Sequence, residues 1–230
     1  MPADIVGFGD EGVFVGFNNG NGTFDSSSPQ AAVNDFGYNQ GWRVDRHPRF
    51  PADLTGDGLA DIVGFGYRGV YVSLNNGNGT FQVPQQGVVN DFGYDGTAGG
   101  WRVDRHPRLL ADLTGDGRAD IVGFGYEGVF VSLNNGDGTF QVLSQKVVND
   151  FGYNQGWRVD RHPRLLADLT GDGRADIVGF GYDGIIVSLN NGDGTFQLPQ
   201  QEGFRDFGYD DTAGGWRVDR HPRFLAEVSL

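Results

Sequence analysis

The chain lacks cysteine, and none of its 230 residues belongs to a long apolar run. Without cysteine there is no disulfide, no thiolate metal site and no cysteine nucleophile. Glycine or aspartate interrupts each apolar stretch after a few residues, which excludes a transmembrane helix. The N-terminal stretch MPADIVGFGD has no basic region and no apolar core. We therefore expect no secretory signal and a soluble protein, either cytoplasmic or secreted by a non-classical route.

Positive charge is also scarce. Lysine and arginine together number 17 against 30 aspartates and glutamates, so the formal net charge is −13. This sign disfavours nucleic acid and anionic membranes as partners. Glycine, by contrast, fills 40 positions, and aromatic residues make up 13% of the chain. Together with the absence of a persistent 3.6-residue period, this composition indicates short strands joined by tight turns and almost no helix.

Four near-identical repeats organise the chain. The nonamer GWRVDRHPR occurs at 41–49, 100–108, 156–164 and 215–223, and the heptamer ADIVGFG begins at Ala3, Ala60, Ala119 and Ala175. Within one repeat, alternation and turn signals predict strands at 108–114, 119–125, 128–135 and 140–152. Four antiparallel strands are the content of one propeller blade. The sequence therefore predicts an all-β fold, a β-propeller with four blades per chain.

The two ends of the chain complement each other. The C-terminal RHPRFLAEVSL matches the start of an internal repeat, and the N-terminal MPADIVGFG matches its continuation. We expect residues 224–230 to supply the first strand of a blade whose other strands come from 1–48, a velcro closure that removes a free sheet edge. The whole chain, 1–230, is then one propeller unit, and its remaining blades are 49–107, 108–163 and 164–223.

Three acidic segments share the pattern D-x-T-x-D-G-x-x-D. Oxygen ligands at positions 1, 3, 5 and 9, with a backbone carbonyl at position 7, suit a hard cation, and we predict structural calcium there. The predicted ligands are Asp53, Thr55, Asp57, Leu59, Asp61, Asp112, Thr114, Asp116, Arg118, Asp120, Asp168, Thr170, Asp172, Arg174 and Asp176. The alternative is a plain β-turn, because Asp-Gly is a common hairpin signal. The fourth copy, split between Glu227, Ser229 and Asp4, is expected to be empty or weak.

The segments DLTGDGRADIVGFG and NNGDGTF resemble the FG-GAP or VCBS repeat of integrin α-chain propellers and microbial surface proteins. Combined with DFGY and GWRVDRHPR, they are similar more narrowly to the fungal family of Psathyrella velutina lectin. That resemblance covers all four repeats and implies a propeller with N-acetylglucosamine (GlcNAc) pockets between consecutive blades. Those lectins have about seven repeats, whereas this chain has four.

The nonamer offers the chemistry that a sugar requires. An aromatic face binds the C–H surface of a sugar ring, and a few polar groups bind its hydroxyls. Histidine donates and accepts hydrogen bonds, and arginine presents a rigid fork of donors. The predicted sugar-binding residues are Tyr38, Trp42, His47, Arg49, Tyr94, Trp101, His106, Arg108, Tyr153, Trp157, His162, Arg164, Tyr209, Trp216, His221 and Arg223. For any single member of this set, a purely structural role between blades is the alternative.

The resulting function hypothesis is a multivalent lectin for GlcNAc or N-acetylated glycans, and not an enzyme. Four near-identical sites suit avidity, and no nucleophile–base pair is visible. The alternatives are a protein-binding scaffold of the integrin type and, as the weakest, a polysaccharide-active enzyme. Because the related lectins have wider rings than four blades, we expect two chains to exchange C-terminal strands in a homodimer with eight blades. The alternative is a four-bladed monomer.

Overall fold

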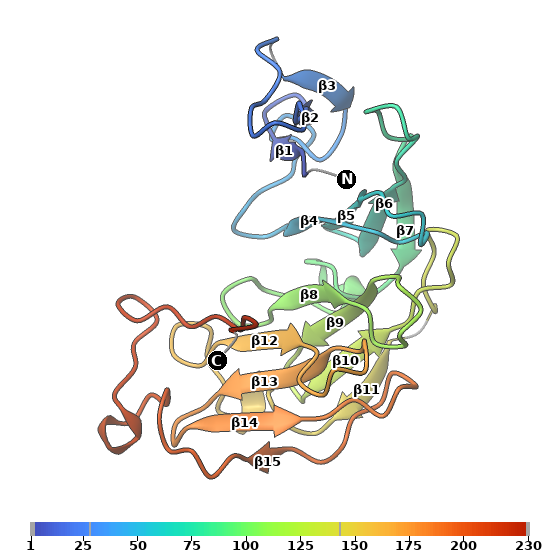
Figure 1. The fold of residues 1–230 in the computed structure, drawn as a ribbon. Helices are drawn as coiled ribbons and strands as arrows, with labels where there is room; N and C mark the ends of the chain where they lie inside the picture. Colours follow the sequence, from blue (N-terminus) through green and yellow to red (C-terminus); the bar gives the residue numbers. More distant parts are fainter. Residues whose placement is uncertain (1–2, 28, 143, 229–230) are drawn as a thin grey trace. The chain divides into compact units, whose positions relative to one another are not determined.

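The computed structural model describes residues 3–27, 29–142 and 144–228, and this part of the chain is all-β, as predicted. Its strands form four antiparallel sheets in the orders β1-β2-β3, β4-β5-β6-β7, β8-β9-β10-β11 and β12-β13-β14-β15 (Figure 1). The chain divides into two compact units, one of residues 1–100 with 135–139 and the other of residues 101–134 with 140–230. Each unit contains two of the sheets.

The first unit contains the first two sheets. The three strands of its first sheet are β1 (Ile5–Phe8), β2 (Val13–Gly16) and β3 (Gln30–Val33). The four strands of its second sheet are β4 (Arg49–Ala52), β5 (Asp61–Phe65), β6 (Val70–Ser73) and β7 (Gln85–Val89). In the described residues β1 pairs with β2 alone, whereas β5, its counterpart, pairs with both β4 and β6. The first sheet therefore has one strand position that no described residue fills.

The second unit repeats the four-stranded arrangement twice. Its first sheet consists of β8 (Arg108–Ala111), β9 (Asp120–Phe124), β10 (Val129–Ser132) and β11 (Gln145–Val148). Its second sheet consists of β12 (Arg164–Ala167), β13 (Asp176–Phe180), β14 (Ile185–Ser188) and β15 (Gln200–Gln201). Figure 1 shows these two sheets side by side, and β8 and β12 are in contact. Residues 224–228 form no strand, and Ser229 and Leu230 lie outside the described residues.

The sequence pattern explains why these segments are strands. Val129 and Val131 of β10 alternate with a less buried Phe130, and both valines belong to the core of the second unit. The second strand of each complete sheet is buried along its whole length, as in DIVGF of β9. The predicted fourth strand at 140–152 is shorter than expected, because β11 covers 145–148 and Phe140 forms only an isolated bridge with Asn134.

Between β10 and β11 the segment NNGDGTF forms a turn. Gly136 and Gly138 have φ angles of 88° and 82°, which residues with a Cβ rarely adopt. Asp137 accepts the backbone N–H and the hydroxyl of Thr139 and so closes the turn.

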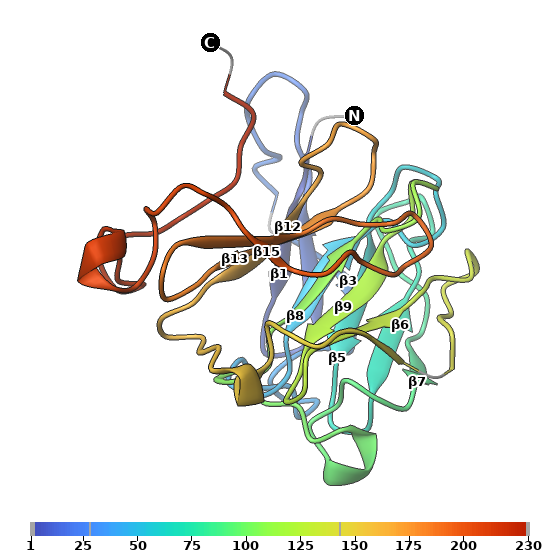
Figure 2. The ribbon, with the colours of Figure 1, turned by 90° about the horizontal axis from the view of Figure 1, so that it is seen from below.

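Helix is limited to three 3₁₀ turns in the described residues. They are Gly96–Ala98, Tyr153–Gln155 and Asp211–Ala213, drawn as short coils in the loops of Figure 2. In each copy the turn lies between the last strand of a sheet and the Trp of the nonamer. No helix in the described ranges is long and apolar enough to cross a bilayer.

Candidate functional site

An aspartate before each nonamer connects a strained backbone corner to the tryptophan. Phe151 has a φ of 62°, which is unusual for a bulky residue. Asp150 Oδ1 accepts the backbone N–H of Phe151 at 2.6 Å and Trp157 Nε1–H at 2.8 Å. The same two bonds are formed by Asp35 to Phe36 and Trp42, and by Asp206 to Phe207 and Trp216. One carboxylate thus fixes both the corner and the orientation of the indole.

The histidine of the nonamer is buried against that tryptophan. The rings of Trp157 and His162 stand edge to face, 5.7 Å apart, and His162 is 7% exposed. His162 Nδ1 accepts the backbone N–H of Arg158 at 3.3 Å. Burial, and then the charges of Arg164 and Arg161, lower the pKa of His162 to about 4. The imidazole is therefore neutral near pH 7, and its proton resides on Nε2.

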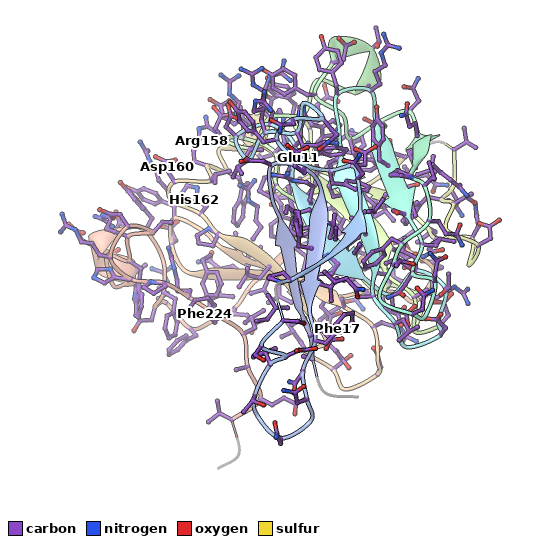
Figure 3. The ribbon with its side chains drawn as sticks, turned by 90° about the horizontal axis from the view of Figure 1, so that it is seen from above. Glu11, Phe17, Arg158, Asp160, His162 and Phe224 are labelled. Atoms are coloured by element: carbon purple, nitrogen blue, oxygen red, sulfur yellow. The ribbon has the colours of Figure 1, made fainter. Side chains whose placement is uncertain are left out.

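His162 Nε2 has no hydrogen-bond partner among the described residues. A buried donor without a partner costs free energy unless a ligand or water satisfies it. Figure 3 shows His162 on the same loop as Arg158 and Asp160, ahead of β12. This nitrogen is therefore the clearest donor that the nonamer can offer to a ligand.

A cavity of the same construction occurs in each unit. In the first unit it measures about 190 Å³ and is lined by Asp35, Gln40, Gly41, Trp42, His47, Gly66, Tyr67, Tyr71 and Gln86. In the second unit it measures about 330 Å³ and is lined by Asp150, Gln155, Gly156, Trp157, His162, Gly181, Tyr182, Asp183, Gly184, Ile186 and Gln201. We call these the Trp42 cavity and the Trp157 cavity. In each cavity, one wall is formed by the loop that follows one sheet, and the opposite wall is formed by the next sheet along the chain.

The predicted tyrosines flank the cavities from the following repeat. The ring of Tyr209 stands edge-on to His162 at 5.8 Å, and the ring of Tyr94 stands edge-on to His47 at 6.0 Å. Tyr38, predicted beside Trp42, instead carries the guanidinium of Arg43 at 3.7 Å from its ring centre.

The side chains of the predicted arginines are buried or half-buried. Arg164 is 4% exposed, and its Nη1 donates to the carbonyl of Phe151 at 3.0 Å. Burial lowers the pKa of this guanidinium to about 10. Arg49 and Arg223 donate in the same way to Phe36 and Phe207. Among the described residues no arginine lines either cavity, so direct contact between these arginines and a sugar stays a prediction.

The other two copies of the nonamer lie in the second unit. Trp101 and His106 are buried 5.7 Å apart, and Tyr126 covers the imidazole at 4.2 Å. Burial, and then the charge of Arg108, lower the pKa of His106 to about 4. Trp216 and His221 keep the same ring geometry at 5.5 Å, but His221 is exposed. The described residues of this unit supply no following sheet to cover it.

Several cavity residues were not predicted from the sequence. The third strand of the next sheet contributes Tyr71 or Ile186, and its last strand contributes Gln86 or Gln201. Tyr67 and Tyr182 come from the FGY that ends each buried strand. The tyrosine of FGY recurs in three of the four repeats, and this was the available signal, although recurrence alone does not separate a cavity wall from a core.

The acidic loops form dense hydrogen-bonded turns. Asp112 accepts backbone N–H groups from residues 114–117 of its own loop. Asp116 accepts the backbone N–H of Arg118 and forms an ion pair with its guanidinium. The loop at 168–176 repeats these contacts.

The third carboxylate of the loop supports the sheet. Asp120 is 1% exposed and accepts the backbone N–H groups of Leu113 and Asn134. Burial raises its pKa to about 6. In the described ranges no group of three or more His, Cys, Asp or Glu is placed to hold a metal ion. As folded, these residues do not form a cation cage, and calcium stays a prediction from their spacing.

The fold is similar to a solved Agrocybe aegerita lectin, with 50% identity and a TM-score of 0.88 over 98% of this chain. That structure is described as the basis of specific recognition of non-reducing terminal N-acetylglucosamine. This chain spans only 54% of the length of the lectin.

A more distant likeness concerns the fold alone. A chain of the Photorhabdus luminescens Tc holotoxin pore matches 87% of this chain at 21% identity, with a TM-score of 0.56. No protein-family model and no curated protein matches the sequence.

Proposed function

We propose that this chain is a lectin that binds non-reducing terminal GlcNAc in the Trp42 and Trp157 cavities, as the Psathyrella velutina lectin family resemblance implies. One observation carries the proposal: a cavity with a Trp, a His and a Tyr at equivalent positions occurs twice in a chain 50% identical to a GlcNAc-recognising lectin. Each cavity joins an indole, a buried histidine and an exposed tyrosine. This combination suits a sugar ring with polar edges. The proposal assigns no reaction to the site.

The test is calorimetric titration with GlcNAc, together with binding to a GlcNAc-coated surface. Tyr67 and Tyr182 are 51% and 55% exposed, so their replacement by alanine leaves the core intact. We expect the Tyr67→Ala/Tyr182→Ala variant to lose two sites and to bind the coated surface at least tenfold more weakly, because avidity multiplies the contribution of each site. Val83→Ser/Val142→Ser, at residues 86% and 77% exposed and outside both cavities, is the control.

Three outcomes would contradict the proposed lectin function. A folded wild-type chain that binds no GlcNAc excludes it. Binding only to a folded protein would favour the scaffold, and turnover of a chromogenic glycoside would favour the enzyme.

The proposal includes completion of the first sheet by the C-terminal segment, and so closure of a propeller. Residues 223–226 match Arg164–Ala167 of β12, so by analogy with the pairing of β12 and β13 we expect Phe224 opposite Val6 and Leu225 opposite Ile5. Phe224 is 81% exposed, and Figure 3 shows it on the C-terminal segment. Val228 of the same segment is 80% exposed, so this segment has two apolar side chains that a partner strand position could bury.

The free edge of β1 has features that suit an added strand. A cavity of about 540 Å³ in the first unit is lined by Ala3, Asp4 and Val6 on one side and by Pro51 and Leu59 on the other. Asp4 Oδ1 accepts the backbone N–H of Asn18, as Asp61 Oδ1 accepts that of Asn75. Asp61 Oδ2 accepts the backbone N–H of Leu54, whose counterpart in the C-terminal segment is Val228. The same bond from Val228 to Asp4 would fix the register.

We propose that this strand comes from a second copy of the chain, which gives a homodimer with eight blades. The related lectins have wider rings than four blades, and the side chains between blades are repeated almost unchanged along this chain. The arrangement would also cover the exposed His221 and complete the fourth nonamer site.

Calcium binding by the three acidic loops is a separate hypothesis that the spacing of their oxygens supports. The carboxylates that would bind the cation already accept backbone N–H groups of their own loops. We expect chelation with EDTA to lower the melting temperature and added calcium, but not magnesium, to restore it. A ligand that binds only the folded state at a hundred times its Kd stabilises by about 2.7 kcal/mol. Identical melting curves in both buffers would leave the loops as turns.

A further inference from the structure

The two cavities differ at one wall position. Tyr71 of β6 and Ile186 of β14 occupy the same register, since each lies opposite a buried glycine, Gly64 or Gly179. Each also pairs with the glutamine that lines its cavity, Gln86 or Gln201. The difference between Tyr71 and Ile186 is therefore a change of side chain at a fixed backbone position.

The tyrosine narrows the Trp42 cavity. Its ring stands edge-on to Trp42, with 5.3 Å between ring centres and an interplanar angle of 81°. It also covers Gly66 so closely that a Cβ on that glycine would lie 2.5 Å from Tyr71 Cε2. These contacts place the phenol ring along the wall between Trp42 and Gly66.

The isoleucine leaves this region open in the Trp157 cavity. A Cβ on Gly181, the counterpart of Gly66, would lie 3.4 Å from Ile186 Cδ1, which is an ordinary contact distance. The cavity is correspondingly larger, about 330 Å³ against about 190 Å³, and its lining extends to Asp183 and Gly184. The added space is bounded on one side by an aliphatic side chain.

We propose that the residue at this position sets the size of the acyl group that each cavity takes, so that the two sites are not equivalent. The inference rests on the proposed lectin function. The Trp157 cavity accommodates an N-acylated hexosamine with an acyl chain longer than acetyl, whereas Tyr71 excludes the longer chain from the Trp42 cavity. Burial of each added methylene against Ile186 favours binding by about fourfold.

The experiment compares calorimetric titrations with N-acetylglucosamine and N-butanoylglucosamine. In the wild type we expect the butanoyl sugar to fill fewer sites than the acetyl sugar. Tyr71→Ile should add one butanoyl site, and Ile186→Tyr should remove one. The double variant Tyr71→Ile/Ile186→Tyr exchanges the two side chains and should restore the wild-type number. Phe130, at the same position in the third sheet, is unchanged throughout and provides a constant background.

The titrations can contradict the proposed role of the wall position in two ways. Equal numbers of butanoyl and acetyl sites in the wild type, or single variants that leave the butanoyl number unchanged, would overturn the inference. Absence of any GlcNAc binding by the folded wild type is a different result, and it removes the lectin proposal itself. The two single variants are independent tests, so poor folding of one leaves the other decisive.

Discussion

Gly179→Ala is expected to lower the free energy of unfolding by about 3 kcal/mol, the upper part of the range for overpacking a core. A Cβ at this position would lie 2.3 Å from Trp157 Cη2 and 2.8 Å from Phe151 Cε1. Neither ring has free space to enter, because Trp157 is held by Asp150 and is 5% exposed. For a chain of this size, the change corresponds to a fall of roughly 10 °C in melting temperature. Urea denaturation followed by tryptophan fluorescence measures it.

Gly203→Ala is the matched control. Gly203 has no atom within 4 Å of the added Cβ, and its φ is not in the left-handed region. We expect its stability to remain within about 0.5 kcal/mol of the wild type. Gly179→Ala should also weaken sugar binding at the Trp157 cavity, because the indole that forms its wall must move. Equal stability of the two variants would show that the indole and the sheet are not in tight contact.

Deletion of residues 224–230 is expected to halve the mass of the particle in solution. The full chain should have a mass of about twice the 24.9 kDa of one copy at micromolar concentration, and the shortened chain that of a single copy. The physical reason is that the edge of β1 then has no strand to pair with. Light scattering after size exclusion gives both masses.

A point variant tests the contact of the C-terminal segment without shortening the chain. Phe224→Asp places a charge in the proposed contact with Val6, whereas Val44→Asp adds the same charge at an exposed position of the first nonamer, 81% exposed like Phe224. Only the first should dissociate the dimer. A full-length chain with the mass of one copy would contradict the dimer and favour closure within a single chain.

Much of the fold was predictable because strand period and glycine turns are local signals. The alternation around Val129 and Val131 and the turn at Gly136 were both confirmed. The extent of the fourth strand was not, because β11 covers only Gln145–Val148 and Phe140 forms an isolated bridge with Asn134. The strand expected at 224–230 depends on a partner that no local signal identifies.

Only one wall of the Trp157 cavity could be predicted from the sequence. Trp157 and His162 lie in the nonamer, and their proximity follows from a spacing of five residues. Ile186 lies opposite them through the packing of one sheet on the next, which the sequence does not specify. Arg164 has the chemistry of a sugar contact, yet its Nη1 holds the carbonyl of Phe151, and Arg164 is not among the described residues that line the Trp157 cavity. The chemistry of arginine made Arg164 a candidate sugar contact, whereas its burial and its hydrogen bond give it a structural role.

The carboxylate of Asp150 has a further consequence for how such repeats diverge. A substitution there would remove, in one step, the bond that holds Phe151 in its strained conformation and the bond that orients Trp157. Substitutions that change the cavity without disturbing the backbone are thus expected at positions other than Asp150. The chain fits this expectation, since its four nonamers are identical while the wall position carries Tyr71, Phe130 and Ile186 in successive copies. Repeats of this type can change one wall of the cavity at a single strand position while the corner beside the tryptophan stays fixed.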